Sequence, residues 1–571
     1  MNIKEEIKKI IETTVKKIGE INSPVLIEVP NEKIRGDYST NIVFNLSNKL
    51  KKSPMEIADK IISQIGKNKI FEKIEAVSPG FINFYLSKEF FINNLKEILK
   101  TNKDFGKNKN LKNQKVIIEY TDPNILKEFH IGHLMSNSIG ESLSRIFEFS
   151  GAKIKRACYQ GDVGLHIAKA IWESNNQGQL RITDVQSSAR AYVVGSEMYN
   201  TDSQVKKEID GINKKIYDRS NPKINTLYDS GKKISLEYFE NIYKKLGTKF
   251  DDYFFESQIA DIGKKIIENG LKKGIFEKGE KGAIIFRGEK YGLHTRVFIN
   301  SEGIPTYEAK DLALAKIKYS KYKYDKSIVV TANEQSDYFK VMLCAMAQIY
   351  TDLAKKTKHI GHGILRLPEG KMSSRTGKVV TFEFLLNKVE ELVLEKIKDR
   401  DLGTSSSQAS AETEKKEIIE KVAIGAVKYS ILKQSIGSDI IYDFDKSISF
   451  DGDSGPYLQY SYARAQSVLR KAKDEKIKTS LKNIPQEINQ LEKNMSYFPE
   501  IIEKAGKQYE PHYIVLYLTE LARDFNNYYA KNKIVDKEDE FSPYKVALTE
   551  AFSIIMKNGL WLLGINSLEK M

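Results

Sequence analysis

The sequence predicts an α/β protein with a parallel-sheet core, a small α/β domain before it and an all-α bundle after it. Three observations lead to this prediction. The run KVIIEY at 115–120 is short, mostly apolar and β-branched, which is typical of a strand buried on both faces of a parallel sheet. An amphipathic helix pattern follows at 129–151. Beyond residue 415, helical patterns dominate to the C-terminus.

Length and composition limit the class of protein. With 571 residues, 41% of them hydrophobic and 29% charged, the chain can bury several cores, and about four domains are expected. The net charge, 91 − 76 = +15, favours a polyanionic partner, although a lysine-rich composition throughout the chain would give the same value. No run of about 18 apolar residues occurs and the N-terminus lacks an apolar signal core, so we expect no membrane segment and a cytoplasmic location. Two cysteines, Cys158 and Cys344, fit no metal or disulfide framework, so no protein-bound metal is expected.

Residues 1–108 have the pattern of a small α/β domain. In SPMEIADKIISQI, Ser53 and Glu56 form a capping-box pattern around Pro54 at the first helical position. The stretch GFINFYLS at 80–87 alternates like a strand, and a helical pattern follows it. The polar stretch 102–113 predicts a linker.

Residues 114–400 are predicted to form the central α/β domain. Further strands of its sheet are expected at 153–162 and 326–335, and the polar, tyrosine-rich stretch at about 175–250 is predicted to be a helical insertion. The low-complexity stretch at 401–414 predicts a flexible connector.

Two helical regions complete the predicted organisation. Residues 415–454 are expected to be a helical connector, and residues 455–571 an all-α bundle.

The stretch FHIGH at 129–133 holds two of only seven histidines in the chain. A strand, a short loop and a helix start form the geometry at which α/β sheets bind nucleotides, since free N–H groups at the helix start attract phosphate. His130 and His133 could donate hydrogen bonds to phosphoryl oxygens, and Gly132 would let a ligand ring pack on the backbone. A pair of helix-capping histidines is the alternative.

A second stretch, RLPEGKMSSRTGKVV at 366–380, combines basic and hydroxyl side chains in a glycine-flanked loop. Such a loop suits a triphosphate leaving group, whereas a solvated charged loop is the alternative. HIGH and KMSSR, about 240 residues apart and in this order, resemble the two signatures of class I aminoacyl-tRNA synthetases.

Within that class the chain resembles the arginyl-tRNA synthetases over nearly its whole length. The similar stretches are SPGFINFYLS, TDPNILKEFHIGH, YQGDVGLHIAKAIW, GIPTYEAKDLALA, KMSSRTGKVV and GPYLQYSYARAQSVLRKA. The resemblance implies an N-terminal domain that contacts tRNA, a Rossmann-like catalytic core with an insertion, and a helical anticodon-binding domain.

The resemblance also implies roles for residues of the two signatures. His130 and His133 would stabilise the α-phosphate of ATP, while Lys127 and Lys371 would neutralise the charge that develops on pyrophosphate. The usual second lysine of the loop is Ser374 here, and Lys127, three residues before His130, would substitute for it. Contacts to ATP are implied for Pro123, Gly132, Ser373, Ser374 and Arg375.

The implied arginine contacts are Glu119, Asn124, Tyr307 and Asp311. Carboxylates in fixed positions match the planar guanidinium group, and Tyr307 and Asp311 are four residues apart, which places them on one helical face. The family pattern often has serine or alanine where Asp122 stands. A glutamine that some members place near Val341 is absent, and Gln335 is the expected substitute.

The function implied is ATP-dependent attachment of L-arginine to arginine tRNA through arginyl-adenylate, with Mg²⁺ accompanying ATP and tRNA required for activation. The resemblance further implies a monomer whose C-terminal bundle reads the anticodon. We expect Tyr460, Arg464 and Tyr528 to contact tRNA there, because aromatic rings stack on unpaired bases and cations bind phosphates. The alternatives are another class I synthetase, a small-molecule adenylyltransferase with the same phosphate signature, or a catalytically inactive RNA-binding paralogue.

Overall fold

The computed structural model describes residues 2–19, 24–30, 35–176, 182–368, 380–397 and 408–571. At its centre is a five-stranded sheet in the order β11-β10-β4-β5-β6, in which every pair of neighbouring strands is parallel. The strands are β4 (Lys115–Tyr120), β5 (Lys153–Gln160), β6 (Asp252–Phe255), β10 (Lys326–Ala332) and β11 (Thr357–His362). The expected strands β4, β5 and β10 are confirmed, whereas β6 and β11 were not predicted.

The sheet buries both of its faces under helices. On β4, Val116 and Ile118 join the core beneath α5 (Ile131–Phe149), while Ile117 joins the core beneath α11 (Tyr307–Lys321) and α12 (Ser336–Ile349). This alternation follows from the two-residue period of a strand. The apolar residues that recur along α5 at spacings of three and four are all buried: Ile131, Leu134, Met135, Ile139, Leu143, Ile146 and Phe147.

The strand order predicts a ligand-binding position at the carboxyl ends of the central strands. The chain builds β5 and β6 on one side of β4 and then crosses to β10 and β11 on the other side. In open α/β sheets, ligands bind at such a switch point, beyond the carboxyl ends of the strands. The loop between β4 and α5 lies at this edge.

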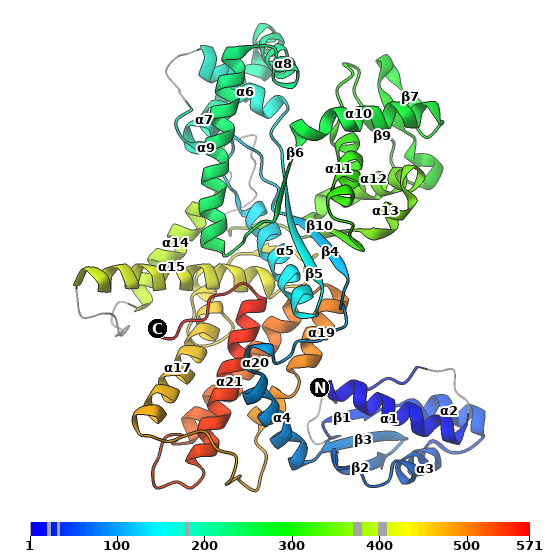
Figure 1. Cartoon of the computed structure of the whole chain (residues 1–571), viewed down its shortest axis with the longest axis vertical. Helices are drawn as coiled ribbons and strands as arrows, with labels where there is room; N and C mark the ends of the chain where they lie inside the picture. Colours follow the sequence, from blue (N-terminus) through cyan, green and yellow to red (C-terminus); the bar gives the residue numbers. More distant parts are fainter. Residues whose placement is uncertain (1, 20–23, 31–34, 177–181, 369–379, 398–407) are drawn as a thin grey trace.

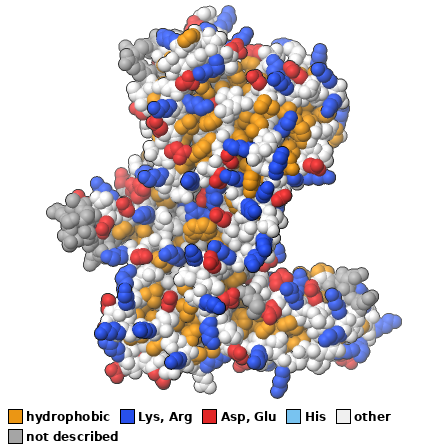
Figure 2. Space-filling model, viewed as in Figure 1, with side chains coloured by type: hydrophobic (Ala, Val, Ile, Leu, Met, Phe, Trp, Pro, Cys, Tyr) orange, Lys and Arg blue, Asp and Glu red, His pale blue; other side chains and the backbone are white. Residues whose placement is uncertain are grey.

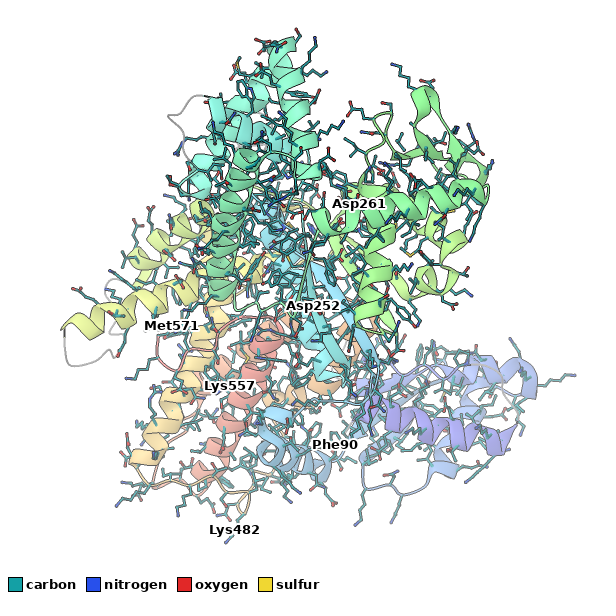
Figure 3. The ribbon with its side chains drawn as sticks, turned by 45° about the horizontal axis from the view of Figure 1, so that its top comes forward. Phe90, Asp252, Asp261, Lys482, Lys557 and Met571 are labelled. Carbon is teal, nitrogen blue, oxygen red and sulfur yellow. The ribbon has the colours of Figure 1, made fainter. Side chains whose placement is uncertain are left out.

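Two groups of helices lie at the end of the molecule away from the C-terminal bundle (Figures 1 and 3). The first group shares one hydrophobic core and comprises α6 (Leu165–Asn176), α7 (Val185–Thr201), α8 (Ser203–Asp218) and α9 (Pro222–Leu246). The second comprises α10 (Glu256–Lys272), which carries the labelled Asp261, α11, α12 and α13 (Thr351–Lys356). Beside it lies a small antiparallel sheet of β7 (Glu277–Lys278), β8 (Ile284–Phe286) and β9 (Arg296–Ile299).

The N-terminal region folds around its own core of helices and an antiparallel sheet in the order β1-β3-β2. Its elements are α1 (Ile3–Ile18), β1 (Tyr38–Thr40), α2 (Ile42–Leu50), α3 (Pro54–Ile65), β2 (Phe71–Val77) and β3 (Phe81–Leu86). The predicted capping box is confirmed, since Ser53 and Glu56 bond each other's backbone N–H groups.

This N-terminal region docks on the C-terminal bundle. The following helix, α4 (Lys88–Thr101), packs against α21 (Ser542–Leu562), and Figure 1 shows α4 beside the bundle. Three polar contacts join the same two regions: Asn2 to Glu503 (2.6 Å), Tyr38 to Glu500 (3.2 Å) and Asp37 to Lys493 (3.1 Å).

The C-terminal part is almost entirely helical. A connecting region contains β12 (Leu365–Arg366), α14 (Phe382–Ile397), α15 (Gln408–Leu432), β13 (Ile440–Ile441) and α16 (Phe444–Ser447). The bundle contains α17 (Gly455–Asp474), α18 (Gln490–Met495), α19 (Phe498–Gln508), α20 (His512–Lys531) and α21. The prediction of a flexible connector at 401–414 is wrong from Gln408 onward, where α15 has begun; residues 398–407 lie outside the described part.

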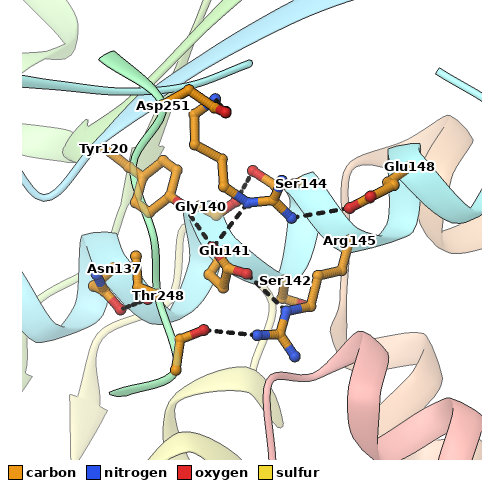
Figure 4. Close-up of polar contacts among 12 residues, drawn as sticks. Tyr120, Asn137, Gly140, Glu141, Ser142, Ser144, Arg145, Glu148, Thr248 and Asp251 are labelled. Atoms are coloured by element: carbon orange, nitrogen blue, oxygen red, sulfur yellow. Dashed lines mark hydrogen bonds and ion pairs between the residues drawn. The ribbon is translucent and has the colours of Figure 1, made fainter. Parts of the chain in front are cut away.

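A buried polar network fixes the middle of α5 (Figure 4). The carboxylate of Glu141 accepts hydrogen bonds from Tyr120 (2.6 Å), Arg145 (2.7 Å) and Arg156 (3.2 Å). Burial raises the pKa of Glu141, but the charges of Arg145 and Arg156 outweigh it and hold the pKa below its ordinary value. Arg145 also donates to the carbonyl oxygens of Gly247 and Trp561, each at 2.8 Å. Helix α5 is therefore tied to the segment after α9 and to α21.

Basic side chains are distributed over the whole visible surface rather than gathered in one patch (Figure 2). This distribution agrees with a net charge of +15 carried by a chain that is rich in lysine throughout. None of the helices in the described ranges has the length and apolar run that crossing a bilayer requires.

The packing of α5 on β4 gives the first prediction. A Cβ atom on Gly140 would lie 2.3 Å from the ring of Tyr120, so Gly140→Ala must displace a buried side chain. We expect a loss of about 1–3 kcal/mol of stability, measured as a lower midpoint of thermal unfolding. Gly211→Ala on α8 is the control, because its Cβ would meet no atom within 4 Å and alanine favours a helix by about 0.5–1 kcal/mol. Equal midpoints for the two variants would contradict this packing.

Candidate active site

The loop between β4 and α5 is held in a strained conformation at the carboxyl edge of the sheet. Thr121 (φ 83°), Asp122 (φ 45°) and Leu126 (φ 61°) all have left-handed backbone conformations without being glycine. Asn137 donates to the hydroxyl of Thr121 (3.0 Å), and the Asp122 carboxylate accepts from the backbone N–H of Tyr159 (2.7 Å). Strain of this kind persists where the surroundings enforce it, and it is concentrated at functional sites.

His130 and His133 cap the start of α5. Nδ1 of His130 accepts from the backbone N–H groups of Gly132 (3.1 Å) and His133 (3.4 Å), and Nδ1 of His133 accepts from the N–H of His130 (3.2 Å). The rings stack with centroids 3.6 Å apart, and a Cβ atom on Gly132 would lie only 3.0 Å from the His130 ring. Because both Nδ1 atoms accept, the proton of each neutral ring is assigned to Nε2.

Both imidazoles are neutral at pH 7. Burial, with the nearby charge of Lys127, lowers the pKa of His130 to about 4. Burial, followed by the effects of His130 and Lys127, holds the pKa of His133 well below its ordinary value. The capping alternative is thus confirmed, and it leaves an Nε2–H donor on each ring for a ligand.

The other predicted phosphate contacts fall into two sets. Lys127 is half-buried in the same loop, with Nζ 4.3 Å from the centroid of the Tyr192 ring, and Pro123 is buried there. Lys371, Ser373, Ser374 and Arg375 lie outside the described residues.

Three carboxyl groups gather at the end of β4 and on α11: Glu119 is buried, and Asp122 and Asp311 are half-buried. Glu119 pairs with Lys318 (2.8 Å), and both side chains are buried. Asp311 accepts a hydrogen bond from Tyr338 at 2.5 Å. Burial raises the pKa of Asp311 to about 7, a rise that the Tyr338 hydrogen bond opposes and the charge of Glu119 reinforces. Burial and Glu119 also raise the pKa of Asp122 well above its ordinary value.

The remaining predicted arginine contacts differ in their surroundings. Asn124 forms an isolated backbone bridge with Gly161, at the end of β5. Tyr307 begins α11 and is 54% exposed, one turn before Asp311, so the predicted helical relation of the two is confirmed. Gln335 is exposed on the short 3-10 turn after β10, and Val341 is a buried residue of α12.

Sequence reasoning missed three residues of this cluster. Lys318 is the ion-pair partner of Glu119, Tyr338 is the hydrogen-bond donor to Asp311, and the buried hydroxyl of Tyr159 has no partner among the described residues. Only Lys318 had a detectable signal, because it follows Asp311 by seven residues, or two helical turns.

A second candidate site lies on the C-terminal bundle. A pocket of about 420 Å³ is lined by Tyr460, Arg464, Arg470, Lys471, Tyr529 and Lys570, together with Met571 at the C-terminus (labelled in Figure 3). The guanidinium of Arg464 lies 4.8 Å from the ring of Tyr460 and 5.0 Å from that of Tyr529. Tyr528 does not line this pocket; it is half-buried against the hydrophobic cores, and its neighbour Tyr529 takes the exposed position.

The fold and the helix start together define a class of protein. A parallel sheet with a switch point beside its first strand, followed by HIGH at the start of the next helix, is the arrangement of a class I aminoacyl-tRNA synthetase. Family models match three regions: the arginyl-tRNA synthetase N-terminal domain (1–86), the catalytic domain of class I tRNA synthetases (R) (94–444) and the DALR anticodon-binding domain (458–571). The chain belongs to the arginyl-tRNA synthetase family.

Full-length relatives agree with this assignment. The arginine–tRNA ligase of Clostridium acetobutylicum is 33% identical, over 100% of this chain and 99% of the relative, and that of Halothermothrix orenii is 31% identical over 100% of both. Two solved structures share the fold: arginyl-tRNA synthetase from Plasmodium falciparum (TM-score 0.80, 23% identity, 100% and 99% coverage) and from Thermus thermophilus (TM-score 0.76, 21% identity, 100% coverage of both).

Proposed function

We propose that the chain activates L-arginine with ATP at the β4–α5 site and transfers it to the terminal adenosine of an arginine tRNA. As a member of the arginyl-tRNA synthetase family, the chain is an arginine–tRNA ligase with ATP as its substrate. The alternatives of a different class I synthetase, an adenylyltransferase or an inactive RNA-binding paralogue are not favoured.

The acidic cluster of Glu119, Asp122 and Asp311 is the observation on which we base the choice of amino acid. Glu119, Asp122 and Asp311 bring three carboxyl groups to the end of β4 and α11, and Lys318 is the cation paired with one of them. Arginine carries two cationic groups, an α-ammonium and a planar guanidinium, so it suits a cluster with an excess of carboxylates. We propose that Asp311 accepts from the guanidinium and that Glu119, Asn124 and Tyr307 complete the arginine contacts, with Gln335 as a further candidate.

The chemistry proposed needs no protein nucleophile. A carboxylate oxygen of arginine attacks the α-phosphorus of ATP in line; the new O–P bond forms as the bond to the β-phosphate oxygen breaks, and pyrophosphate leaves with its electron pair. The Nε2–H groups of His130 and His133 would donate to the α-phosphate oxygens, and Lys127 and Lys371 would stabilise the leaving charge. The tRNA hydroxyl then attacks the activated carbonyl, loses its proton, and AMP leaves.

We propose that the magnesium ion is bound by the phosphates of ATP rather than by a protein site. Among the described residues, no group of three or more His, Cys, Asp or Glu side chains could hold a metal ion. Mg²⁺ often binds through substrate phosphates and water with few protein ligands, so we propose that it enters with the triphosphate. We further propose a cytoplasmic monomer in which tRNA binding precedes activation.

The function is tested by charging bulk tRNA with each of the twenty amino acids, using the protein and its His130→Asn variant. Asparagine is a good helix N-cap, so this variant keeps the cap of α5 while it removes the Nε2–H donor. We expect arginine alone to be attached, and the variant to be slower by about 10²–10³-fold with unchanged thermal stability. Attachment of another amino acid instead of arginine would contradict the proposal, and wild-type turnover by the variant would contradict the role of His130.

The raised pKa of Asp311 predicts how arginine binding depends on pH. Because the carboxyl group is protonated below about pH 7, it cannot pair with a guanidinium there, and arginine affinity should fall as the pH is lowered from 8 to 6. Asp311→Asn should weaken binding at pH 8 by about 10–100-fold and abolish this pH dependence. Calorimetric titration with arginine measures both effects, and Asp337→Asn, at an exposed position in the first turn of α12, is the control. A pH profile that Asp311→Asn leaves unchanged would exclude Asp311 as the titrating group.

The pocket on the bundle predicts the effect of Arg464 on tRNA binding. We propose that its rings and cations bind the anticodon loop, which in arginine tRNAs shares a middle cytosine. Arg464→Ala should weaken tRNA binding and lower the slope of log affinity against log salt by about one, as for the loss of one phosphate contact, while ATP binding is retained. Filter binding with arginine tRNA, and with a tRNA altered at the middle anticodon base, measures this; exposed Arg523→Ala is the control. An equal loss of tRNA affinity in Arg464→Ala and Arg523→Ala would argue against tRNA binding at the pocket.

A further inference from the structure

The loop that carries Lys127 is anchored to the end of β5 through Asp122 and Asn124, but around Lys127 itself it is anchored in the helical group α6–α9. The side chains of Ile125 and Leu126 are fully buried in the core of that group. The backbone N–H of Leu126 donates to the hydroxyl of Ser235 on α9 (2.9 Å), and that of Phe129 donates to the hydroxyl of Tyr238 one turn further on (3.1 Å). Residues on both sides of Lys127 are therefore fixed by helices that follow it by about 100 positions in the chain.

The side chain of Lys127 is held by the same group of helices. Its Nζ lies 4.3 Å from the ring centroid of Tyr192 on α7, and the Tyr192 ring packs against the α6–α9 core. A cation over an aromatic face is attracted by the ring quadrupole, most strongly where both groups are partly desolvated, and both are half-buried here.

A free lysine side chain has many rotamers, and each would place its charge differently. Charge stabilisation in a transition state requires a cation that is already in position, because reorganisation during the reaction lowers the benefit. The ring of Tyr192 restricts the ammonium of Lys127 to a position whose charge reaches both His130 and His133.

We propose that Tyr192 is a positioning residue for arginine activation: the face of its ring holds Lys127 where the departing pyrophosphate develops charge. The proposal rests on the proposed role of Lys127. It gives the helical group α6–α9 a part in the chemical step, through Tyr192 on α7 and the α9 hydroxyls that fix the loop.

The same helix offers a matched control. Tyr199 on α7 has Nζ of Lys169 4.5 Å from its ring centroid, a pair with nearly the same geometry, and its ring also packs against the α6–α9 core. Tyr199→Leu therefore removes a ring of the same size and a comparable cation–π contact, together with the Tyr199 hydrogen bond to Asp210 (3.0 Å), without touching Lys127.

The test measures arginine-dependent exchange of pyrophosphate into ATP in the presence of tRNA. Tyr192→Leu should lower kcat by about 5–30-fold with little change in the KM for arginine, as expected for a cation–π contact of ordinary strength. Tyr192→Phe, which keeps the ring, and Tyr199→Leu should both stay within about twofold of the wild type. The double variant Tyr192→Leu/Lys127→Ala should be no slower than Lys127→Ala, because Tyr192 acts through Lys127.

The outcomes distinguish a failure of the role of Tyr192 from a failure of the role of Lys127. Wild-type activity of Lys127→Ala would overturn the role of Lys127 and the inference with it. An impaired Lys127→Ala beside an unaffected Tyr192→Leu would overturn the inference alone, and so would a double variant slowed by the product of both single effects. If Tyr192→Leu does not fold, phenylalanines with increasing fluorination at position 192 replace it: activity should fall with each fluorine, since fluorine weakens the ring quadrupole and keeps the shape, and constant activity would overturn the inference.

Discussion

The carboxylate of Glu141 determines where the catalytic helix lies. It is buried in the middle of α5 and accepts hydrogen bonds from Arg145 on the same helix, from Tyr120 on β4 and from Arg156 on β5, so all three partners are present only while β4, β5 and α5 are packed together. Removing one partner of a buried ion pair typically costs about 3–5 kcal/mol. Arg145 extends the same network to carbonyl oxygens after α9 and near the end of α21. Three regions far apart in the chain thus meet on one helix, and that helix begins with His130 and His133.

Groups of opposite charge lie on opposite sides of the candidate active site. On one side, Lys127 and the N-terminus of α5 with its two Nε2–H donors offer positive potential to phosphates. On the other side, Asp122, Asp311 and the paired Glu119 offer acceptors to cationic groups. The histidines remain neutral between them because they are buried beside a lysine. A substrate pair of one polyanion and one dicationic amino acid matches this division, and in the proposed reaction the two would be joined where the sides meet.

The sequence predicted those features that depend on neighbouring residues. The strands β4, β5 and β10, the buried face of α5 and the capping box at Ser53 follow from local periodicity and spacing, and all are present. Contacts between residues far apart in the chain could not be predicted from local periodicity or spacing. Glu119 and Lys318 are 199 residues apart, and Tyr338 donates to Asp311 from another helix. The error at Gln408 arose because low complexity was read as a flexible connector, although alanine and glutamate in that stretch favour a helix. On α20, composition alone could not distinguish the core-facing Tyr528 from the exposed Tyr529.

The attachment of the N-terminal region to the bundle has a consequence for synthesis on the ribosome. Asn2, Asp37 and Tyr38 find their partners between Lys493 and Glu503, and α4 packs on α21, which begins at Ser542. A nascent chain completes its first 86 residues when none of these partners has been made. The N-terminal region therefore reaches its final place only after residues 493–503 are made, and the apolar face of α4 stays uncovered until α21 is made. Synthesis of the C-terminal end, rather than of the catalytic sheet, is the event that completes assembly of this molecule.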